Sequence, residues 1–155
     1  MKKVTLGRKS GIEISAIVMG MWQAGKAYWT GINDQDSLEA VRTAIDCGVN
    51  TFDTAEEYGR GHSERILGQA IQEHRKHVVL MSKVFSNHLQ HDQVIASCER
   101  SLKNLKTDYL DLYQVHWPSG AWGTKTVPIE ETMSALTHLK TQGKIRSIGV
   151  SNFSL

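Results

Sequence analysis

Four side chains capable of acid–base or hydrogen-bonding chemistry each end a short run of β-forming residues. They are separated by 30, 33 and 35 residues, in the order Asp53, Lys83, His116 and Ser151. Each interval has the length of one strand plus the helix and loops that lead to the next strand. Parallel strands place their carboxyl ends on one rim, which is where α/β proteins build their sites. We therefore expect these four side chains to lie near one another.

Tyr58 lies five residues after Asp53, in a loop that can reach the same rim. Asp53 and Lys83 would end neighbouring strands, ~4.8 Å apart, and could form an ion pair, although such a pair taken alone is more often structural. A tyrosine is a poor acid at neutral pH unless an ammonium within hydrogen-bond distance favours its phenolate form. His116 supplies a donor or an imidazolium that can polarise a carbonyl oxygen. Together these residues predict a proton donor beside a polarising histidine.

β-forming runs alternate with helix-period sequence along the chain. We expect five strands, at residues 17–20, 50–53, 78–83, 111–116 and 147–151. We expect four helices between them, at residues 35–47, from about 63, from about 92, and from 128 to 143. This alternation is typical of a parallel sheet covered by helices. Ahead of it, residues 3–6 and 12–15 predict a β-hairpin that could cap one end of the sheet, with its turn at Lys9, Ser10 and Gly11.

The first and last helices carry recognisable end signals. Asp34 or Asp36 is expected as the N-cap of the first helix, and Gly48 as its C-cap. Pro128 suits the first turn of the last helix, because a missing N–H costs nothing there. Helical spacing predicts one buried stripe on that last helix, made by Ile129, Met133 and Leu136.

The composition is that of a single globular domain, which we assign to residues 1–155. With 40 % hydrophobic residues, 22 % charged residues and a formal net charge of +2, the chain is not of the disordered class. We find neither a ~20-residue apolar run nor a secretion signal, so we expect a cytoplasmic protein without membrane contact. The absence of Lys or Arg runs argues against nucleic-acid binding and favours a small-molecule partner. Cys47 and Cys98 are expected to be reduced thiols.

Other candidate groups have simpler interpretations. Two histidine pairs have i, i+3 spacing, but neither has the further ligands of a tetrahedral site, so we expect a solvated surface and no metal: His74 with His77, and His88 with His91. Cys98 lies on an apolar helical stripe, where packing is expected rather than nucleophilic chemistry. The loop with Gly120, Trp122 and Gly123 could be a flap over the site or ordinary loop packing.

Several short motifs occur in a fixed order along the chain. They are Asn50-Thr51-Phe52-Asp53-Thr54-Ala55-Glu56-Glu57-Tyr58-Gly59, Ser63-Glu64, Lys83, His116-Trp117-Pro118, Gly143-Lys144-Ile145-Arg146 and Gly149-Val150-Ser151-Asn152-Phe153. In sequence, order and spacing the chain resembles the aldo-keto reductase family over nearly its whole length. Within that family it is most similar to the bacterial branch related to potassium-channel β subunits.

The resemblance implies a (β/α)8 barrel that binds NADP(H) at the carboxyl rim and reduces aldehydes or ketones to alcohols. In the family's catalytic tetrad, Tyr58 would be the general acid, Lys83 and Asp53 would tune it, and His116 would orient the substrate carbonyl. The cofactor would be contacted by Met21, Trp22, Asp53, Ser151 and Asn152, of which the last two would hold the nicotinamide carboxamide. The substrate would be enclosed by Trp22, Tyr58 and Trp117.

The length departs from the family, because a closed barrel takes ~250 residues and eight strands, whereas the fifth expected strand ends near residue 151. We therefore expect a partial barrel that is not a stable, active monomer alone. It would be a fragment, a truncated product, or a chain that pairs with a complementary half-barrel or a second copy. The alternative function is a cofactor-sensing or regulatory subunit of reductase-like fold without turnover, and a third possibility is a nonfunctional remnant.

Overall fold

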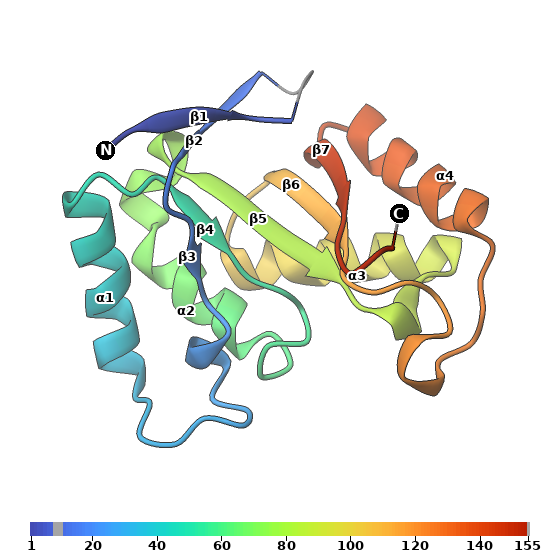
Figure 1. Ribbon diagram of the computed structural model, residues 1–155, viewed down its shortest axis with the longest axis horizontal. Helices are drawn as coiled ribbons and strands as arrows, with labels where there is room; N and C mark the ends of the chain where they lie inside the picture. The colour runs from blue at the N-terminus through green and yellow to red at the C-terminus, as the bar shows by residue number, and fades with distance from the viewer. Residues whose placement is uncertain (8–10, 155) are drawn as a thin grey trace.

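The computed structural model describes residues 1–7 and 11–154, and its centre is a parallel sheet whose strands follow one another in chain order (Figure 1). The strands are β3 (Met19–Gly20), β4 (Thr51–Asp53), β5 (Val79–Val84), β6 (Leu110–Val115) and β7 (Ile145–Val150). The helices that connect them are α1 (Asp34–Asp46), α2 (His62–Ala70), α3 (His91–Leu105) and α4 (Ile129–Thr141). This is the expected partial (β/α)8 barrel, with β3 and β7 as the edge strands of the sheet.

The register of the sheet brings the carboxyl ends of its strands together. Gly20 pairs with Asp53 across β3 and β4, and Lys83 pairs with Gln114 across β5 and β6. The loops after β4, β5, β6 and β7 therefore all leave from one rim. This arrangement confirms the expectation that the residues ending the strands share one end of the sheet.

The main core lies between the sheet and the helices that cover its outer face. Leu80 on β5 and Tyr113 on β6 are fully buried there, together with Leu67 on α2 and Leu105 on α3. Gly68 lets α2 and α3 approach closely, since a Cβ at this position would lie 2.6 Å from the backbone carbonyl of Leu105. A substitution that adds a side chain there must separate the two helices.

The N-terminal hairpin closes the amino end of the sheet, as expected. It consists of β1 (Lys3–Leu6) and β2 (Ile12–Ser15), which pair antiparallel and cross this end in Figure 1. Its apolar side chains pack against a second, smaller cluster on the inner side of β5 and β6, formed by Val79, Met81 and Leu112. Of the predicted turn, Lys9 and Ser10 lie outside the described residues.

Two details of the helix predictions were wrong. The N-cap of α1 is Asn33, whose Oδ1 accepts a hydrogen bond from the Asp36 amide at 2.8 Å; the helix already begins at Asp34, so neither predicted aspartate can be the cap. Ile129 is exposed rather than buried, because α4 begins there, one turn before its first buried residue, Thr132.

Short 3-10 helices occupy loops for which no element was predicted. They are η1 (Gln23–Gly25), η2 (Gln72–His77), η3 (Ser86–His88) and η4 (Ala121–Gly123). Over the described ranges, none of the helices combines the length and apolar character that crossing a bilayer requires. Both cysteines are free, with Cys98 buried in the core and Cys47 exposed.

Candidate active site

Lys83 is the centre of a cluster at the carboxyl rim. Its Nζ donates hydrogen bonds to Asp53 Oδ2 at 2.6 Å and to the Thr54 carbonyl at 2.8 Å. Its third donor reaches Tyr58 Oη at 3.3 Å. Lys83 is buried, and a buried ammonium requires such partners to offset its loss of hydration. The ion pair expected between Asp53 and Lys83 is therefore present, and the same ammonium contacts the tyrosine hydroxyl.

His116 faces the tyrosine from the end of β6. The two rings meet edge to face, with centroids 5.6 Å apart. Burial of the imidazole, and secondarily the nearby Lys83 ammonium, lowers the pKa of His116 from 6.5 to about 4. The ring is therefore neutral at physiological pH, so of the two forms considered from the sequence the structure favours the neutral donor. Its Nδ1 is buried and has no hydrogen-bond partner among the described residues.

Local backbone geometry fixes the loop that carries Tyr58. The Tyr58 amide donates to the Ala55 carbonyl at 3.1 Å, and the Tyr58 carbonyl accepts from the Ser63 amide at 3.2 Å. Gly59 has φ +61° and packs directly against Gly25; a Cβ on Gly25 would lie 2.6 Å from the Tyr58 carbonyl carbon. Only glycine at both positions allows this contact between the loop after β3 and the tyrosine loop.

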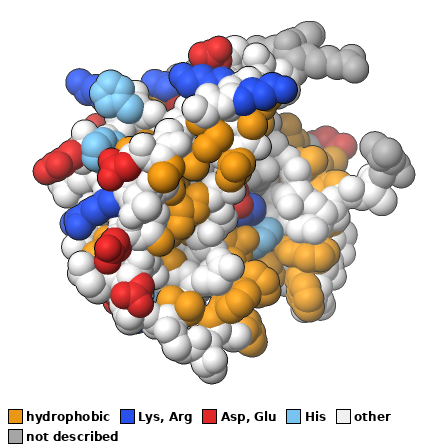
Figure 2. Space-filling view, turned by 60° about the vertical axis from the view of Figure 1, so that its left-hand side comes forward, with side chains coloured by type: hydrophobic (Ala, Val, Ile, Leu, Met, Phe, Trp, Pro, Cys, Tyr) orange, Lys and Arg blue, Asp and Glu red, His pale blue; other side chains and the backbone are white. Residues whose placement is uncertain are grey.

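Aromatic rings surround the cluster. Trp22 lies 6.4 Å from Tyr58 and meets Trp29 edge to face at 5.4 Å, while Trp117 meets the exposed Trp122 at 5.5 Å. Figure 2 shows hydrophobic side chains around a hollow in which parts of a basic, an acidic and a histidine side chain are visible. Trp22 thus lies where an apolar wall was expected. Trp117 directly follows His116 and meets Trp122 of the loop after β6, and its place in the substrate wall stays a prediction.

Ser151 and Asn152 follow β7 and lie beside His116. The Ser151 amide donates to the Val115 carbonyl at 2.8 Å, and Asn152 Nδ2 donates to the His116 carbonyl at 2.9 Å. Asn152 Nδ2 also contacts Ser151 Oγ at 3.1 Å. A hydroxyl and a side-chain amide are therefore placed at the rim next to the histidine.

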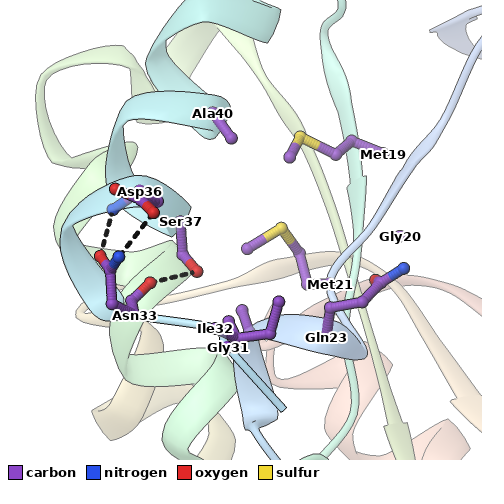
Figure 3. Close-up of a pocket in the computed structure, with 11 residues that line it drawn as sticks. Met19, Gly20, Met21, Gln23, Gly31, Ile32, Asn33, Asp36, Ser37 and Ala40 are labelled. Carbon is purple, nitrogen blue, oxygen red and sulfur yellow. Dashed lines mark hydrogen bonds between the residues drawn. The ribbon is translucent and has the colours of Figure 1, made fainter. Parts of the chain in front are cut away.

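Met21 directly follows β3. Its side chain is buried and lines a pocket of about 370 Å³ between β3 and α1 (Figure 3). In that view Met19 and Met21 point toward the start of α1, where Asn33 and Asp36 hydrogen-bond to each other. The cofactor contact expected for Met21 stays a prediction.

Three neighbours of the cluster were missed in the sequence. The Phe85 ring lies 5.6 Å from His116, Gln114 Nε2 donates to Asp53 Oδ1 at 3.4 Å, and Glu56 accepts the Phe85 amide hydrogen bond at 2.7 Å. Phe85 and Gln114 could have been found by their strand positions beside Lys83 and His116. Glu56 could not have been found in this way, because it lies in a loop, where strand or helix periodicity does not determine the direction of a side chain.

The remaining candidates do not form a second site. His88 Nδ1 contacts Glu56 and His91 Nδ1 contacts Asp92, each through one carboxylate. Across residues 1–7 and 11–154 no three His, Cys, Asp or Glu side chains gather in a way that could hold a metal ion. Burial raises the pKa of Cys98 to about 12, so its thiol is unsuited to nucleophilic chemistry.

Comparisons with known proteins show which family the chain belongs to. The model of the aldo/keto reductase family matches residues 16–155. The chain belongs to this family. It is 44 % identical to the aldo-keto reductase YhdN of Bacillus subtilis over 94 % of this chain and 46 % of that protein. It is 38 % identical to the methylglyoxal reductase YeaE of Escherichia coli over 91 % of this chain and 46 % of that protein.

Solved structures of aldo-keto reductases have the same fold. The thermostable aldo-keto reductase Tm1743, bound to the inhibitor epalrestat, superposes with a TM-score of 0.86 at 42 % identity, over 99 % of this chain and 54 % of that one. An aldo/keto reductase of Klebsiella pneumoniae in complex with NADP and acetate gives 0.82 at 39 % identity, over 93 % and 48 %. The chain thus spans about half the length of the relatives it matches.

Proposed function

We propose that this chain supplies the catalytic tetrad of an NADP(H)-dependent aldo-keto reductase, which reduces aldehydes or ketones to alcohols. The supporting observation is the position of Lys83 Nζ, which contacts Asp53 Oδ2 at 2.6 Å and Tyr58 Oη at 3.3 Å. His116 lies against the same tyrosine ring. A proton donor, the cation that promotes its ionisation and a neutral polarising donor therefore face one space.

Each residue of the tetrad has a distinct role in the proposed reaction. Tyr58 donates the proton of its hydroxyl to the carbonyl oxygen of the substrate. Lys83 stabilises the phenolate that remains, and Asp53 holds the ammonium in place through their ion pair. Neutral His116 donates a hydrogen bond that orients the substrate carbonyl and stabilises the charge developing on its oxygen. The product is an alcohol, and the tyrosine regains its proton from water.

The residues at the rim fit the nicotinamide end of NADP(H). Ser151 and Asn152 offer a hydroxyl and a side-chain amide, which complement the donor and acceptor of a carboxamide, and Trp22 offers an exposed aromatic face. When bound, the nicotinamide supplies the hydride that reaches the carbonyl carbon. The choice between NADPH and NADH is part of the proposal; we favour NADPH because the Klebsiella relative binds NADP.

The substrate class, the cellular location and the branch remain proposals of the same kind. The methylglyoxal reductase among the relatives makes small reactive aldehydes the first substrates to test. A cytoplasmic location is consistent with the reduced state of both cysteines. Assignment to the branch related to potassium-channel β subunits stays a prediction, since the relatives named above are an aldo-keto reductase and a methylglyoxal reductase.

We further propose that catalysis requires strands that pair with β3 and β7. Both are edge strands of the sheet. Parallel sheets are normally enclosed by further structure, and an open edge presents unpaired backbone N–H and C=O groups. A complementary half-barrel or a second copy of the chain could provide them. Light scattering tests this proposal: a single-chain mass of 17.3 kDa combined with a cooperative melt and full activity would contradict it.

The test of the function is NADPH consumption with methylglyoxal and with 4-nitrobenzaldehyde, by the chain alone and mixed with the complementary carboxyl-terminal half of YhdN. Turnover that is lost in Tyr58→Phe supports the reductase. Turnover that survives this change removes the proposed role of Tyr58. Enhanced NADPH fluorescence without turnover would instead select the cofactor-sensing subunit, and the absence of both signals would select a remnant.

A further inference from the structure

We propose that Glu56 is a positioning residue for the proton donor, because its carboxylate holds the loop of residues 54–61, which carries Tyr58, against strand β5 and helix α3. The inference rests on the proposed role of Tyr58. It concerns a different property, namely how the distance between the tyrosine and the histidine is maintained.

Glu56 connects its loop to three other segments. Its amide donates to the Lys83 carbonyl at 3.3 Å, and its Oε1 accepts from the Phe85 amide at 2.7 Å. The same Oε1 contacts His88 Nδ1 at 3.0 Å, and Oε2 accepts from Arg100 Nη2 at 3.2 Å. One residue therefore joins the tyrosine loop to the end of β5, to η3 and to α3.

The Glu56 carboxylate lies beside a hollow on one side of the loop. A hollow of about 300 Å³ lies there, and its lining is mostly charged or polar: Glu56, Glu57, Arg60, Glu64, His88, Arg100 and Asn104, with Gly61. The Glu56 side chain is nevertheless only 9 % exposed. A carboxylate so shielded from water forms strong, directional contacts, and on the side of the hollow these contacts hold the loop in place of close packing.

The contacts of the Glu56 carboxylate affect the positions of both Tyr58 and His116. Tyr58 lies two residues beyond Glu56 in a tight turn, so a displacement of Glu56 moves the phenol. Phe85, whose amide Glu56 accepts, packs its ring 5.6 Å from the His116 ring. Loss of the carboxylate therefore frees the two sides of the site from each other, and a misplacement of ~1 Å is enough to slow a reaction about 100-fold.

The experiment compares Glu56→Ala, Glu56→Gln and the control Glu57→Ala in the full chain, with the YhdN half-barrel present if turnover requires it. Glu57 is adjacent and exposed, and its own carboxylate makes none of these contacts to the Phe85 amide, His88 or Arg100. For Glu56→Ala we expect kcat to fall about 10- to 100-fold, KM to stay within about twofold, and the solvent isotope effect on kcat to rise. Glu56→Gln should recover part of kcat, because its amide oxygen still accepts from Phe85. Glu57→Ala should match the parent.

Hydrogen exchange of the Tyr58 and Phe85 amides separates this inference from the reductase proposal. If the parent protein has no reductase activity, the proposed function fails, while faster exchange at both amides in Glu56→Ala and not in Glu57→Ala still supports the anchoring role. If Glu56→Ala does not fold, Glu56→Gln and Arg100→Met give the same comparison. Unchanged kcat and exchange in these variants, or equal losses in the Glu57 control, would overturn the inference.

Discussion

The two ends of the sheet each hold a carboxylate paired with basic side chains, but the two clusters differ in how completely their polar atoms are satisfied. At the amino end, Asp111 is 2 % exposed. Its Oδ2 accepts from Arg75 Nη2 at 3.1 Å and from the Leu80 amide at 2.9 Å, and its Oδ1 accepts from Arg146 Nη1 at 2.8 Å. Both carboxylate oxygens are therefore occupied by the protein itself.

The two arginines at this end share a second contact besides Asp111. Their guanidinium groups lie over the Tyr109 ring, with Arg75 at 3.8 Å and Arg146 at 4.1 Å from its centroid. Arg75 also donates to the carbonyls of Val78 and Tyr109. This network joins β5, β6 and β7 around one carboxylate whose two oxygens both accept hydrogen bonds from the protein.

The rim cluster is less complete. Asp53 is 26 % exposed, and among the described residues its carboxylate is bonded, apart from Lys83, to Gln114 alone, at a long 3.4 Å. His116 Nδ1 is buried without a partner among the described residues. Polar groups left free in a partly buried site can bind something else. Similar charged residues therefore stabilise the structure where all their hydrogen-bonding atoms have protein partners. Where some of these atoms lack partners, the same residues can bind a ligand or take part in catalysis.

The largest effect should come from Lys83→Met, which tests the rim directly. Loss of the ammonium removes the charge that stabilises the tyrosine phenolate, and we expect kcat/KM to fall by about 10²–10⁴. The melting temperature should change less than in a variant of the amino-end cluster, because the freed Asp53 carboxylate reaches water. Steady-state kinetics and thermal melts measure the two effects. If Lys83→Met kept the kcat/KM of the parent, the functional difference inferred between the rim cluster and the amino-end cluster would be wrong.

Asp111→Ala should have the next largest effect, and on stability instead of activity. It leaves two guanidinium groups and the Leu80 amide without their acceptor, and breaking such a buried network typically costs ~3–5 kcal/mol of unfolding free energy. Denaturant unfolding measures the loss, and Asp111→Asn, which keeps the size of the side chain and one acceptor oxygen, serves as the milder control. A fall in kcat of the folded protein without a loss of stability would contradict the assignment of a bracing role.

The third effect concerns pH and the neutral state of His116. Burial lowers the pKa of His116 to about 4, whereas in the unfolded chain it lies near 6.5, so the unfolded state binds more protons between these values. Stability contributed by His116 is therefore present above pH 6.5 and falls as the pH drops toward 4, by about 3 kcal/mol in total, since one pKa unit corresponds to ~1.4 kcal/mol.

His116→Gln isolates this contribution, because the uncharged amide does not titrate. Plotted against pH, the free energies of unfolding of parent and variant should run parallel above neutral pH. Below it, that of the parent should fall more steeply. Glu64, whose pKa burial raises, is common to both proteins, so its effect cancels in the difference. Identical pH dependence in parent and variant would mean that the imidazole is already charged or exposed in the folded protein.

The sequence predicted the elements and the convergence of the tetrad because both follow from local periodicity and from the geometry of parallel strands. Asp53 ends β4, Lys83 is the last residue but one of β5 and His116 directly follows β6, so chain spacing alone placed them on one rim. The tyrosine was placed because its loop is short. These are the features for which local sequence and global fold agree.

What the sequence did not predict depends on loop conformation or on contacts between distant segments. The carboxylate of Glu56 reaches Arg100 across 44 residues, and Arg75 reaches Asp111 across 36, without any periodic signal. Nor did the sequence predict that the Met21 side chain lines the pocket beside α1. The N-cap of α1 was missed because three residues within one turn, Asn33, Asp34 and Asp36, all have suitable side chains.

The smallest effect separates burial from the number of partners as the origin of the difference between the two ends. Asp34 also has two basic partners, Lys26 Nζ and His62 Nε2, each at 2.8 Å from its Oδ1, and these contacts lower its pKa. Its side chain is however 42 % exposed, and exposed ion pairs contribute only ~0–1 kcal/mol. Asp34→Asn should therefore destabilise the protein by at most ~1 kcal/mol, and less at high salt, where the pairs are screened. Denaturant unfolding at low and high ionic strength measures this. If Asp34→Asn lowered the unfolding free energy as much as Asp111→Ala, the number of partners, and not their burial, would determine how much a carboxylate cluster stabilises the protein.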